Sequence, residues 1–134
     1  MDDADLLDLA REVAARAYAP YSRFRVGAAL RDGSGGVFGG CNVESASFGL
    51  TICAERAAIF AAIAAGATRP FRAMALTCLD AVPGGCMPCG ACRQLLWEHF
   101  DPDAQLHVQG AGSFRVGDLL PYAFRLAGQA YNAG

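Results

Sequence analysis

The chain has 134 residues, a formal net charge of −2 and 54% hydrophobic residues, so we expect one compact domain over residues 1–134 rather than a disordered segment. Its longest apolar stretch, residues 57–67, is far shorter than the roughly 20 residues that span a bilayer, which argues against a membrane protein. All 11 basic residues are scattered arginines, a distribution that argues against binding to a nucleic-acid backbone.

The first predicted element is an amphipathic helix over residues 3–17. Apolar residues such as Leu6, Ala10 and Val13 recur there at helical spacing, with charged residues between them. This stretch begins acidic, whereas a secretory signal begins basic and continues as an apolar core. We therefore expect a cytoplasmic protein, in which crowded cysteines indicate metal or redox chemistry rather than disulfides.

The next predicted elements are strands. Residues 24–31 alternate in polarity, and a glycine-rich turn separates them from residues 37–41, which predicts a β-hairpin. Residues 72–79 form a continuous apolar run, as is typical of a central strand covered on both faces. Shorter strands are predicted around residues 106–108 and 114–116.

Two further helices, over residues 53–65 and 89–100, alternate with the strands. This alternation predicts an α/β domain, a three-layer α/β/α sandwich around a mixed, roughly five-stranded sheet. The first of these helices is apolar on all sides after its first turn, which is typical of a buried helix. That first turn nevertheless contains Glu55 and Arg56, and burying such charges is costly unless they are paired or bound to a ligand.

The cysteines carry the main chemical signal. Cys89 and Cys92 follow Pro88 in the first turn of a helix and point to the same side, so they can hold one ion together. Cys53 opens the other helix, so three thiolates can meet at two helix N-termini, whose partial positive charge favours them. Three ligands leave one tetrahedral position open for water, as in a catalytic zinc site, whereas a structural zinc is closed by four. The pattern predicts one Zn²⁺ per chain.

Three polar side chains near these cysteines are candidates for catalysis and for tuning the metal. Glu55 lies two residues after Cys53, within reach of a metal-bound water, and is the candidate proton carrier. Arg56 and Gln94 can donate hydrogen bonds to the ligand sulfurs and withdraw charge from them. The alternatives are a surface ion pair for Glu55 with Arg56, and a solvated polar residue for Gln94.

Two other interpretations of the cysteines stay open on spacing alone. A Pro-Cys-x-x-Cys sequence that opens a helix also occurs in thioredoxin-type redox proteins. The spacing of Cys86, Cys89 and Cys92, with a remote fourth cysteine, fits an iron–sulfur cluster, although the usual Cys-Pro partner is missing. We expect Cys86 to be a loop thiol rather than a fourth metal ligand, and Cys41 and Cys78 to be small buried residues in strands.

The sequence resembles the cytidine deaminase family in its short form with three cysteine ligands. The zinc deaminase pattern is a ligand, one residue and glutamate, followed by Pro-Cys-x-x-Cys, and it reads here as CAE from Cys53 and PCGAC from Pro88. The resemblance continues in YSRFRVGAAL from Tyr21, GCNVESASFGLTICAERAAI from Gly40 and LLPYAF from Leu119. Blasticidin deaminases share the metal motif, but NVESASFGL is closer to the nucleoside enzymes.

The resemblance implies zinc-dependent hydrolysis of cytidine and 2′-deoxycytidine to uridine and 2′-deoxyuridine, with release of ammonia, in pyrimidine salvage. The activated water attacks C4 of the cytosine ring while Glu55 carries a proton to N3 and then to the departing amine. Asn42 and Glu44 are implied to bind the ribose 3′-hydroxyl. The backbone amide of Ala54 is expected to donate to the ring O2, and Phe24 to pack on the pyrimidine. From the residues alone, Asn42 is more typical of a turn, and Phe24 is typical of a core strand.

Family members of this length are usually homotetramers whose pockets are completed by neighbouring subunits. The resemblance assigns this contribution to Ala46, Phe48 and Phe124. The family usually has tyrosine where this chain has Phe48, so a hydroxyl contact is missing, and Arg25 stands where proline is frequent. A free nucleoside is the expected small-molecule partner, because a polynucleotide would need a basic channel for its flanking nucleotides.

Overall fold

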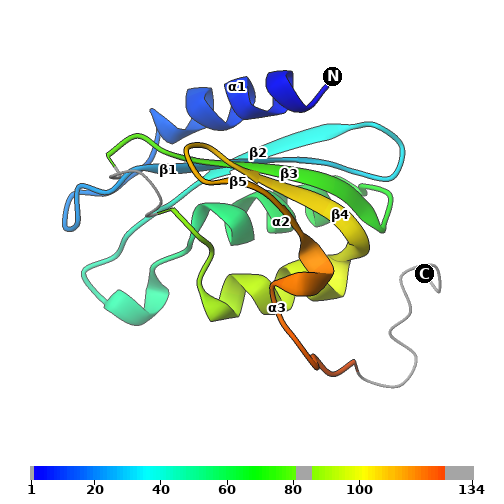
Figure 1. Cartoon of the computed structure of the whole chain (residues 1–134). Helices are drawn as coiled ribbons and strands as arrows, with labels where there is room; N and C mark the ends of the chain where they lie inside the picture. The colour runs from blue at the N-terminus through cyan, green and yellow to red at the C-terminus, as the bar shows by residue number, and fades with distance from the viewer. Residues whose placement is uncertain (1, 81–85, 126–134) are drawn as a thin grey trace.

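A five-stranded mixed sheet forms the centre of the computed structural model, which describes residues 2–80 and 86–125 (Figure 1). The sheet has the order β2-β1-β3-β4-β5, in which β3 and β4 run parallel and the other neighbours run antiparallel. The strands are β1 (Val26–Arg31), β2 (Val37–Cys41), β3 (Phe71–Cys78), β4 (Phe100–Val108) and β5 (Gly112–Arg115). The predicted mixed sheet of five strands is confirmed.

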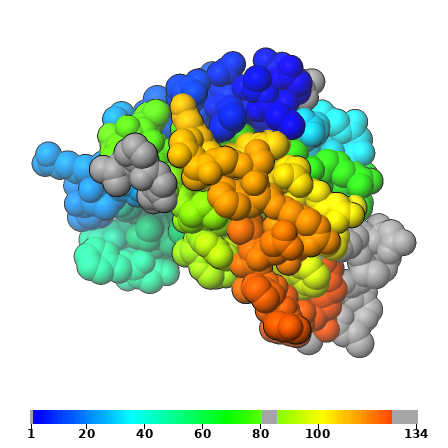
Figure 2. All heavy atoms as spheres, in the orientation of Figure 1, coloured from blue at the N-terminus to red at the C-terminus, as the bar shows by residue number. Residues whose placement is uncertain are grey.

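Helices cover both faces of this sheet, which confirms the predicted three-layer arrangement. Helix α1 (Asp3–Ala14) lies on one face, and α2 (Ala54–Ala64) and α3 (Gly90–His99) lie on the other (Figure 1). The space-filling view shows α1 on one side of the molecule and the segment that ends at residue 125 on the opposite side (Figure 2). Side chains that alternate along the strands fill both interfaces, with small residues toward α1 and larger residues toward α2 and α3.

Two glycines let the helices pack directly on the strand backbone. A Cβ atom on Gly27 would lie 1.9 Å from the carbonyl oxygen of Ala10, so α1 requires glycine at this point of β1. A Cβ atom on Gly40 would lie 2.3 Å from the backbone nitrogen of Ala58 in α2. The close contact at Gly40 fixes how far α2 stands from the sheet, and with it the position of the cysteine and glutamate at its start.

A buried carboxylate holds the hairpin turn between β1 and β2. Asp32 accepts hydrogen bonds from the backbone amides of Ser34, Gly36 and Thr68, at 2.9, 2.7 and 2.8 Å. Burial alone would raise the pKa of Asp32, but these bonds and the Ser34 hydroxyl lower it. The charged carboxylate therefore ties the turn to the chain that follows α2.

Several element boundaries differ from those expected. Helix α1 ends at Ala14 rather than residue 17, and β4 begins at residue 100, directly after α3, rather than at 106. Residue 116 belongs to a short 3-10 helix, Val116–Asp118, rather than to the last strand. None of the helices in the described ranges combines the length and the hydropathy that crossing a bilayer requires.

The expectation that α2 is buried on all sides is wrong for the single chain. One face, which includes Ala58 and Ile59, is fully buried against the sheet, while Phe60 and Ile63 are 46% and 44% exposed. A helix with a second apolar face that the sheet does not cover has the same sequence pattern as a helix that is buried on all sides within one chain.

Candidate metal centre and adjoining pocket

Three cysteine sulfurs meet at the N-termini of α2 and α3. Cys53 and Cys89 are the N-cap residues of the two helices, and Cys92 is buried in the first turn of α3. The three Sγ atoms all lie within 4.8 Å of one another, and those of Cys89 and Cys92 are 3.6 Å apart. Zn–S bonds of about 2.3 Å in a tetrahedral site separate the sulfurs by about 3.8 Å. The predicted trio is therefore assembled at a spacing that fits one zinc ion.

The electrostatic setting of these sulfurs favours thiolates. In the described part of the chain, neither Cys53 nor Cys89 makes a side-chain capping hydrogen bond to its helix. The first backbone amides of α2 and α3 therefore keep their partial positive charge, and they lie at the helix ends where the sulfurs meet. A hydrogen bond with Cys92, followed by one from Arg56, lowers the pKa of Cys53 to about 5. The same contact with Cys53 raises the pKa of Cys92. A bound zinc ion would deprotonate its thiol ligands.

Arg56 makes the contact that was predicted for it. Its Nη2 atom donates a hydrogen bond to Cys53 Sγ at 3.4 Å, and this bond raises the pKa of the guanidinium. Its buried Nε atom has no hydrogen-bond partner among the residues that the structure describes. A guanidinium that donates to a ligand sulfur withdraws negative charge from it, which suits a site with three thiolates. The alternative of an ion pair between Arg56 and Glu55 is not found within the described ranges.

Glu55 lies in the first turn of α2 and is only 4% exposed. Burial is the main reason why its pKa is raised, and the nearby Cys53 thiolate raises it further. A buried carboxyl group with a raised pKa holds a proton more readily than an exposed glutamate does, which suits a group that accepts and donates protons. Its position beside the sulfurs is that expected of a proton carrier.

A cavity of about 430 Å³ adjoins the sulfurs. Its volume lies in the range of small-molecule sites, and most of its lining is apolar. The structure thus brings together most of the predicted residues that would contact a substrate. Those that line the cavity are Phe24, Asn42, Glu44, Ala54 and Glu55, together with Cys53 and Cys89.

The three residues predicted to complete a neighbouring subunit's pocket lie on the surface. Phe48 and Phe124 are 78% and 64% exposed, and Ala46 is also exposed. Phe48 borders a second hollow, of about 420 Å³, which shares Ser22 and Glu44 with the main cavity. The role assigned to these three residues stays a prediction.

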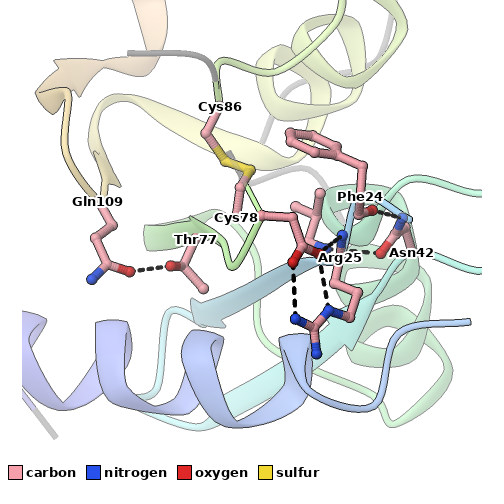
Figure 3. The surroundings of a disulfide bond; sticks show 9 residues. Phe24, Arg25, Asn42, Thr77, Cys78, Cys86 and Gln109 are labelled. Atoms are coloured by element: carbon pink, nitrogen blue, oxygen red, sulfur yellow. Dashed lines mark hydrogen bonds and ion pairs between the residues drawn. A yellow bond between two sulfur atoms is a disulfide. The ribbon is translucent and has the colours of Figure 1, made fainter. Parts of the chain in front are cut away.

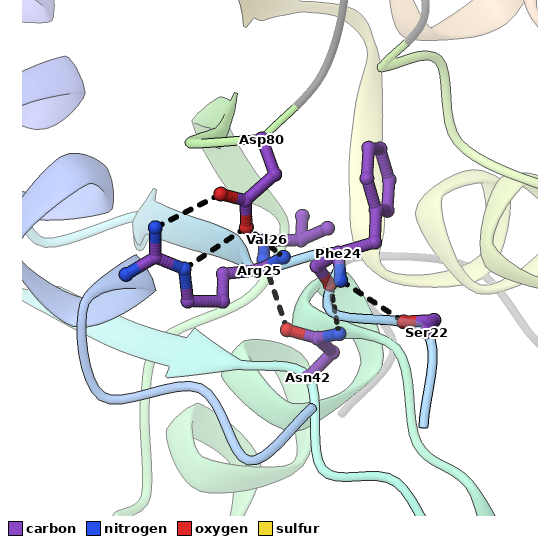
Figure 4. A network of polar contacts seen from close by, with 6 residues as sticks. All are labelled: Ser22, Phe24, Arg25, Val26, Asn42 and Asp80. Carbon is purple, nitrogen blue, oxygen red and sulfur yellow. Dashed lines mark hydrogen bonds and ion pairs between the residues drawn. The ribbon is translucent and has the colours of Figure 1, made fainter. Parts of the chain in front are cut away.

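Asn42 is buried and bonded to the backbone that leads into β1. Its Nδ2 atom donates to the carbonyl oxygen of Phe24 at 2.7 Å, and its Oδ1 atom accepts from the amide of Val26 at 2.9 Å (Figure 4). These bonds leave one N–H and one lone pair of the amide for a ligand. Asn42 therefore fixes the backbone on either side of residue 25 and so places Phe24 at the cavity.

Glu44 is held by the segment that precedes β1. Its Oε1 atom accepts hydrogen bonds from the backbone amides of Tyr21 and Ser22, at 2.9 and 3.1 Å. Its Oε2 atom accepts from the hydroxyl of Ser22. The Ser22 hydroxyl is the main reason why the pKa of Glu44 is lowered, so a charged carboxylate borders the cavity.

The structure gives Gln94 a partner other than the predicted one. Its Nε2 atom donates to Glu98 Oε1 at 3.2 Å, one turn further along α3. The observed bond runs along the surface of its own helix, a common pairing at this spacing. No contact between Gln94 and a cysteine sulfur is found in the described residues.

Two cysteines expected to be free form a disulfide instead. Cys78, at the end of β3, is bonded to Cys86, just before the loop that carries Cys89 (Figure 3). The expectation that Cys86 is a loop thiol and Cys78 a small buried residue is therefore wrong. Both residues border the cavity, and Cys86 is not part of the metal cluster. The bond attaches the start of α3 to the sheet.

Arg25, which stands where the resemblance leads one to expect proline, forms a bidentate pair with Asp80. Its Nε and Nη2 atoms donate to the two carboxylate oxygens, each at 2.9 Å (Figure 4). This contact lowers the pKa of Asp80 to about 2. The pair links the segment before β1 to the chain that follows β3.

Sequence reasoning missed Ser22 and the disulfide as parts of the cavity. Ser22 belongs to the run YSRF, which contributes to the family resemblance but carries no chemical motif of its own. Its contact with Glu44 spans 22 positions in sequence. No local pattern marks such a contact.

Comparison with known proteins places these features in a family. Residues 1–105 match the family model described as the cytidine and deoxycytidylate deaminase zinc-binding region. A cytidine deaminase of Mycobacterium tuberculosis is 47% identical over 117 residues, which are 87% of this chain and 85% of the relative. One of Halalkalibacterium halodurans is 43% identical over 128 residues, with 92% and 95% covered.

Solved structures agree with the sequence matches. The crystal structure of cytidine deaminase from Burkholderia pseudomallei has a TM-score of 0.83 and 44% identity, and the match covers 92% of this chain and all (100%) of that chain. The crystal structure of cytidine deaminase from Mycobacterium tuberculosis has a TM-score of 0.81 and 44% identity, with 94% and 100% covered. Sequence, fold and the sulfur cluster agree, and the chain belongs to the cytidine and deoxycytidylate deaminase family.

Proposed function

We propose that this protein is a zinc-dependent hydrolase that converts cytidine and 2′-deoxycytidine to uridine and 2′-deoxyuridine and releases ammonia, and that residues 1–134 act as one catalytic domain. The observation that carries the proposal is the buried carboxyl group of Glu55 beside three clustered sulfurs at one cavity. Family membership favours this function over the iron–sulfur and thioredoxin-type alternatives.

Cys53, Cys89 and Cys92 would hold the zinc ion, one per chain. Three thiol ligands at a tetrahedral spacing would leave one position open, and no fourth His, Cys, Asp or Glu joins the cluster in residues 2–80 and 86–125. Bound there, zinc supplies a Lewis acid that makes water a nucleophile near neutral pH. Arg56 donates to Cys53 Sγ and so reduces the negative charge that three thiolates place on the site.

Glu55 carries the protons of the reaction. Its raised pKa lets the carboxylate accept a proton from the attacking water and then hold it. The carboxylic acid delivers that proton to N3 of the cytosine ring. Glu55 then transfers the proton of the new C4 hydroxyl to the amine, so that ammonia leaves and C4 becomes a carbonyl. The apolar walls of the cavity exclude bulk water, which keeps the carried proton from exchanging during these steps.

The remaining cavity residues would orient the nucleoside. Phe24 presents an aromatic face for the pyrimidine, and the backbone amide of Ala54 would donate to the ring O2. Asn42 and Glu44 would bind the ribose 3′-hydroxyl, which cytidine and 2′-deoxycytidine share. A site that recognises this hydroxyl accepts both nucleosides.

A homotetramer would cover the apolar surface that the single chain exposes. Phe60 and Ile63 of α2 are exposed and lie on the same helix that holds Cys53 and Glu55. In such an assembly Ala46, Phe48 and Phe124 of one subunit would reach a neighbour's pocket. We also propose a cytoplasmic location, in which the three metal-binding thiols stay reduced and Cys78 and Cys86 are held as thiols by the same reducing conditions, their disulfide forming on oxidation.

The proposed function is tested by following the ultraviolet change when cytidine is added to the zinc-loaded protein. We expect uridine and ammonia in equal amounts. Cys53→Ser should lose zinc and activity together, whereas the matched variant Cys41→Ser, at a free cysteine outside the cluster, should keep both. Failure of the zinc-loaded wild type to form uridine, or full activity of Cys53→Ser without zinc, would overturn the proposal.

A further inference from the structure

Ser22 borders the cavity and contacts Glu44, but the proposed reaction makes no use of its hydroxyl. It lies between α1 and β1 and lines both the main cavity and the second hollow. Glu44 lines the same two spaces. Glu44, which would bind the sugar, thus has the hydroxyl of Ser22 beside it at the cavity.

The hydroxyl of Ser22 has a defined direction. Its Oγ atom accepts a hydrogen bond from the backbone amide of Phe24 at 3.0 Å (Figure 4). Because this amide can only donate, the hydroxyl proton remains free for another acceptor. That acceptor is Oε2 of Glu44, to which the hydroxyl donates. The Ser22 hydroxyl therefore connects the backbone of Phe24, which is expected to pack on the base, to the carboxylate of Glu44, which is expected to bind the sugar.

The backbone around Ser22 is shaped for this contact. Arg23 has a φ of 58°, in the left-handed region that residues other than glycine rarely adopt. Such a conformation persists only where the surroundings hold it. Here the turn directs the amides of Tyr21 and Ser22 to Oε1 of Glu44, while Oε2 takes the Ser22 hydroxyl as its partner. The two carboxylate oxygens of Glu44 thus have different partners, and the Ser22 hydroxyl fixes the position of Oε2.

We propose that Ser22 is a positioning residue for nucleoside binding, whose hydroxyl orients Glu44 Oε2 so that this oxygen can accept a hydrogen bond from the ribose 3′-hydroxyl. The proposal rests on the proposed function. It predicts that Ser22 acts on the binding of substrates that carry a 3′-hydroxyl and leaves the chemistry at C4 unchanged. The hydrogen bond to a charged acceptor sets the expected size of the effect at about tenfold in KM.

The test compares Ser22→Ala with the wild type, both loaded with zinc. For cytidine we expect KM to rise about tenfold while kcat changes less than about twofold. The inhibition constant of 2′,3′-dideoxycytidine, which has no 3′-hydroxyl, should change less than about twofold. Ser22→Thr keeps the hydroxyl and should restore most of the affinity for cytidine.

A matched control exists at the other carboxylate turn. Ser34 donates to Asp32 at 2.8 Å, as Ser22 does to Glu44, but it lies outside the cavity. Ser34→Ala should therefore leave the KM for cytidine unchanged. An unchanged KM in Ser22→Ala, or an equal loss for dideoxycytidine, would overturn the proposal while leaving the proposed function intact. Absence of deamination by the wild type would instead refute the function itself.

Discussion

The three α-helices in the described ranges begin in two different ways. At the start of α1, Asp2 caps the helix with its own carboxylate, and Asp5 completes a reciprocal capping box. At the starts of α2 and α3, Cys53 and Cys89 occupy the capping position, and in the described chain neither side chain bonds to the helix end. A capped end has its backbone donors satisfied, whereas an uncapped end keeps its positive potential available for another negative group.

This difference separates stability from chemistry. The capping box of α1 adds stability to a helix that has no part in the cavity. The uncapped starts of α2 and α3 lack this contribution to stability, which is typically about 1 kcal/mol per helix. Their positive potential instead stabilises thiolates beside the cavity. Close packing of α2 on β2 at Gly40 holds the helix without a cap. A helix end without its usual cap is thus a sign of a functional site in this fold.

The largest effect is expected from Glu55→Gln, at the start of α2. The amide keeps the shape of the side chain but cannot carry a proton, so kcat should fall about 10³-fold, within the range of general acid–base catalysis. Zinc content and the melting temperature should stay near those of the wild type. Uridine formation and metal analysis of the same preparation measure both; retention of most of the activity would contradict the role of Glu55.

The start of α3 has a covalent support that the start of α1 lacks. Closing the short loop between Cys78 and Cys86 should stabilise the oxidised protein by about 2–3 kcal/mol relative to the reduced protein. Urea unfolding before and after treatment with a dithiol measures the difference, with Cys78→Ser/Cys86→Ser as the variant that should not respond. Equal stability of both forms, or two free thiols at these positions after mild oxidation, would refute the structural link.

Arg56→Gln should weaken zinc binding about tenfold, because groups that donate to a metal ligand tune its affinity by this amount. The matched control is Arg11→Gln in α1, where Arg11 pairs with Asp8 on an exposed surface. Competition with a chromophoric chelator measures the affinity of each variant. Equal affinities of the two variants would show that the Arg56 contact with Cys53 has no influence on the metal.

The smallest effect is expected from Asp2→Ala, which removes the cap of α1. The melting temperature should fall by a few degrees, with kcat and zinc content unchanged. The backbone bond from Asp5 is the main reason why the pKa of Asp2 lies below its ordinary value of 3.8. The capping contribution is therefore complete above that ordinary value and is lost as the pH falls through the lowered one. Thermal unfolding at pH 7 and at pH 2 should show a smaller difference between variant and wild type at the lower pH.

Local patterns in the sequence predict most of the elements and the direction of two of the three clustered cysteines, whereas the choice of zinc over the other cysteine chemistries needed the family resemblance. Cys89 and Cys92 lie three residues apart in one helical turn, so their common direction follows from helix geometry. Cys53 and Glu55 could be placed with them because their helix was recognised from its apolar composition. The strands are predicted by alternating polarity and by the apolar run of β3. The C-terminal end of α1 and the start of β4 differ from the prediction because packing, rather than composition, sets these two boundaries.

Contacts between distant segments could not be derived in this way. The bond between Cys78 and Cys86 depends on how the chain returns after β3, and cysteine spacing does not specify pairing. Gln94 has a partner within its own helix at Glu98, which competes with the predicted sulfur. Ser22 meets Glu44 across 22 positions of sequence, beside a left-handed residue, Arg23, that no local pattern predicts. The disulfide and the Ser22 contact depend on tertiary geometry that local residue types leave undetermined, whereas the Gln94 pair follows from the spacing within its own helix.

The metal content and coordination of freshly purified protein test the central claim most directly. We expect one zinc ion per chain and, from X-ray absorption at the zinc edge, three sulfur ligands at about 2.3 Å with one lighter atom in the remaining position. A fourth sulfur or protein ligand in that position, or the absence of zinc from active protein, would contradict the account.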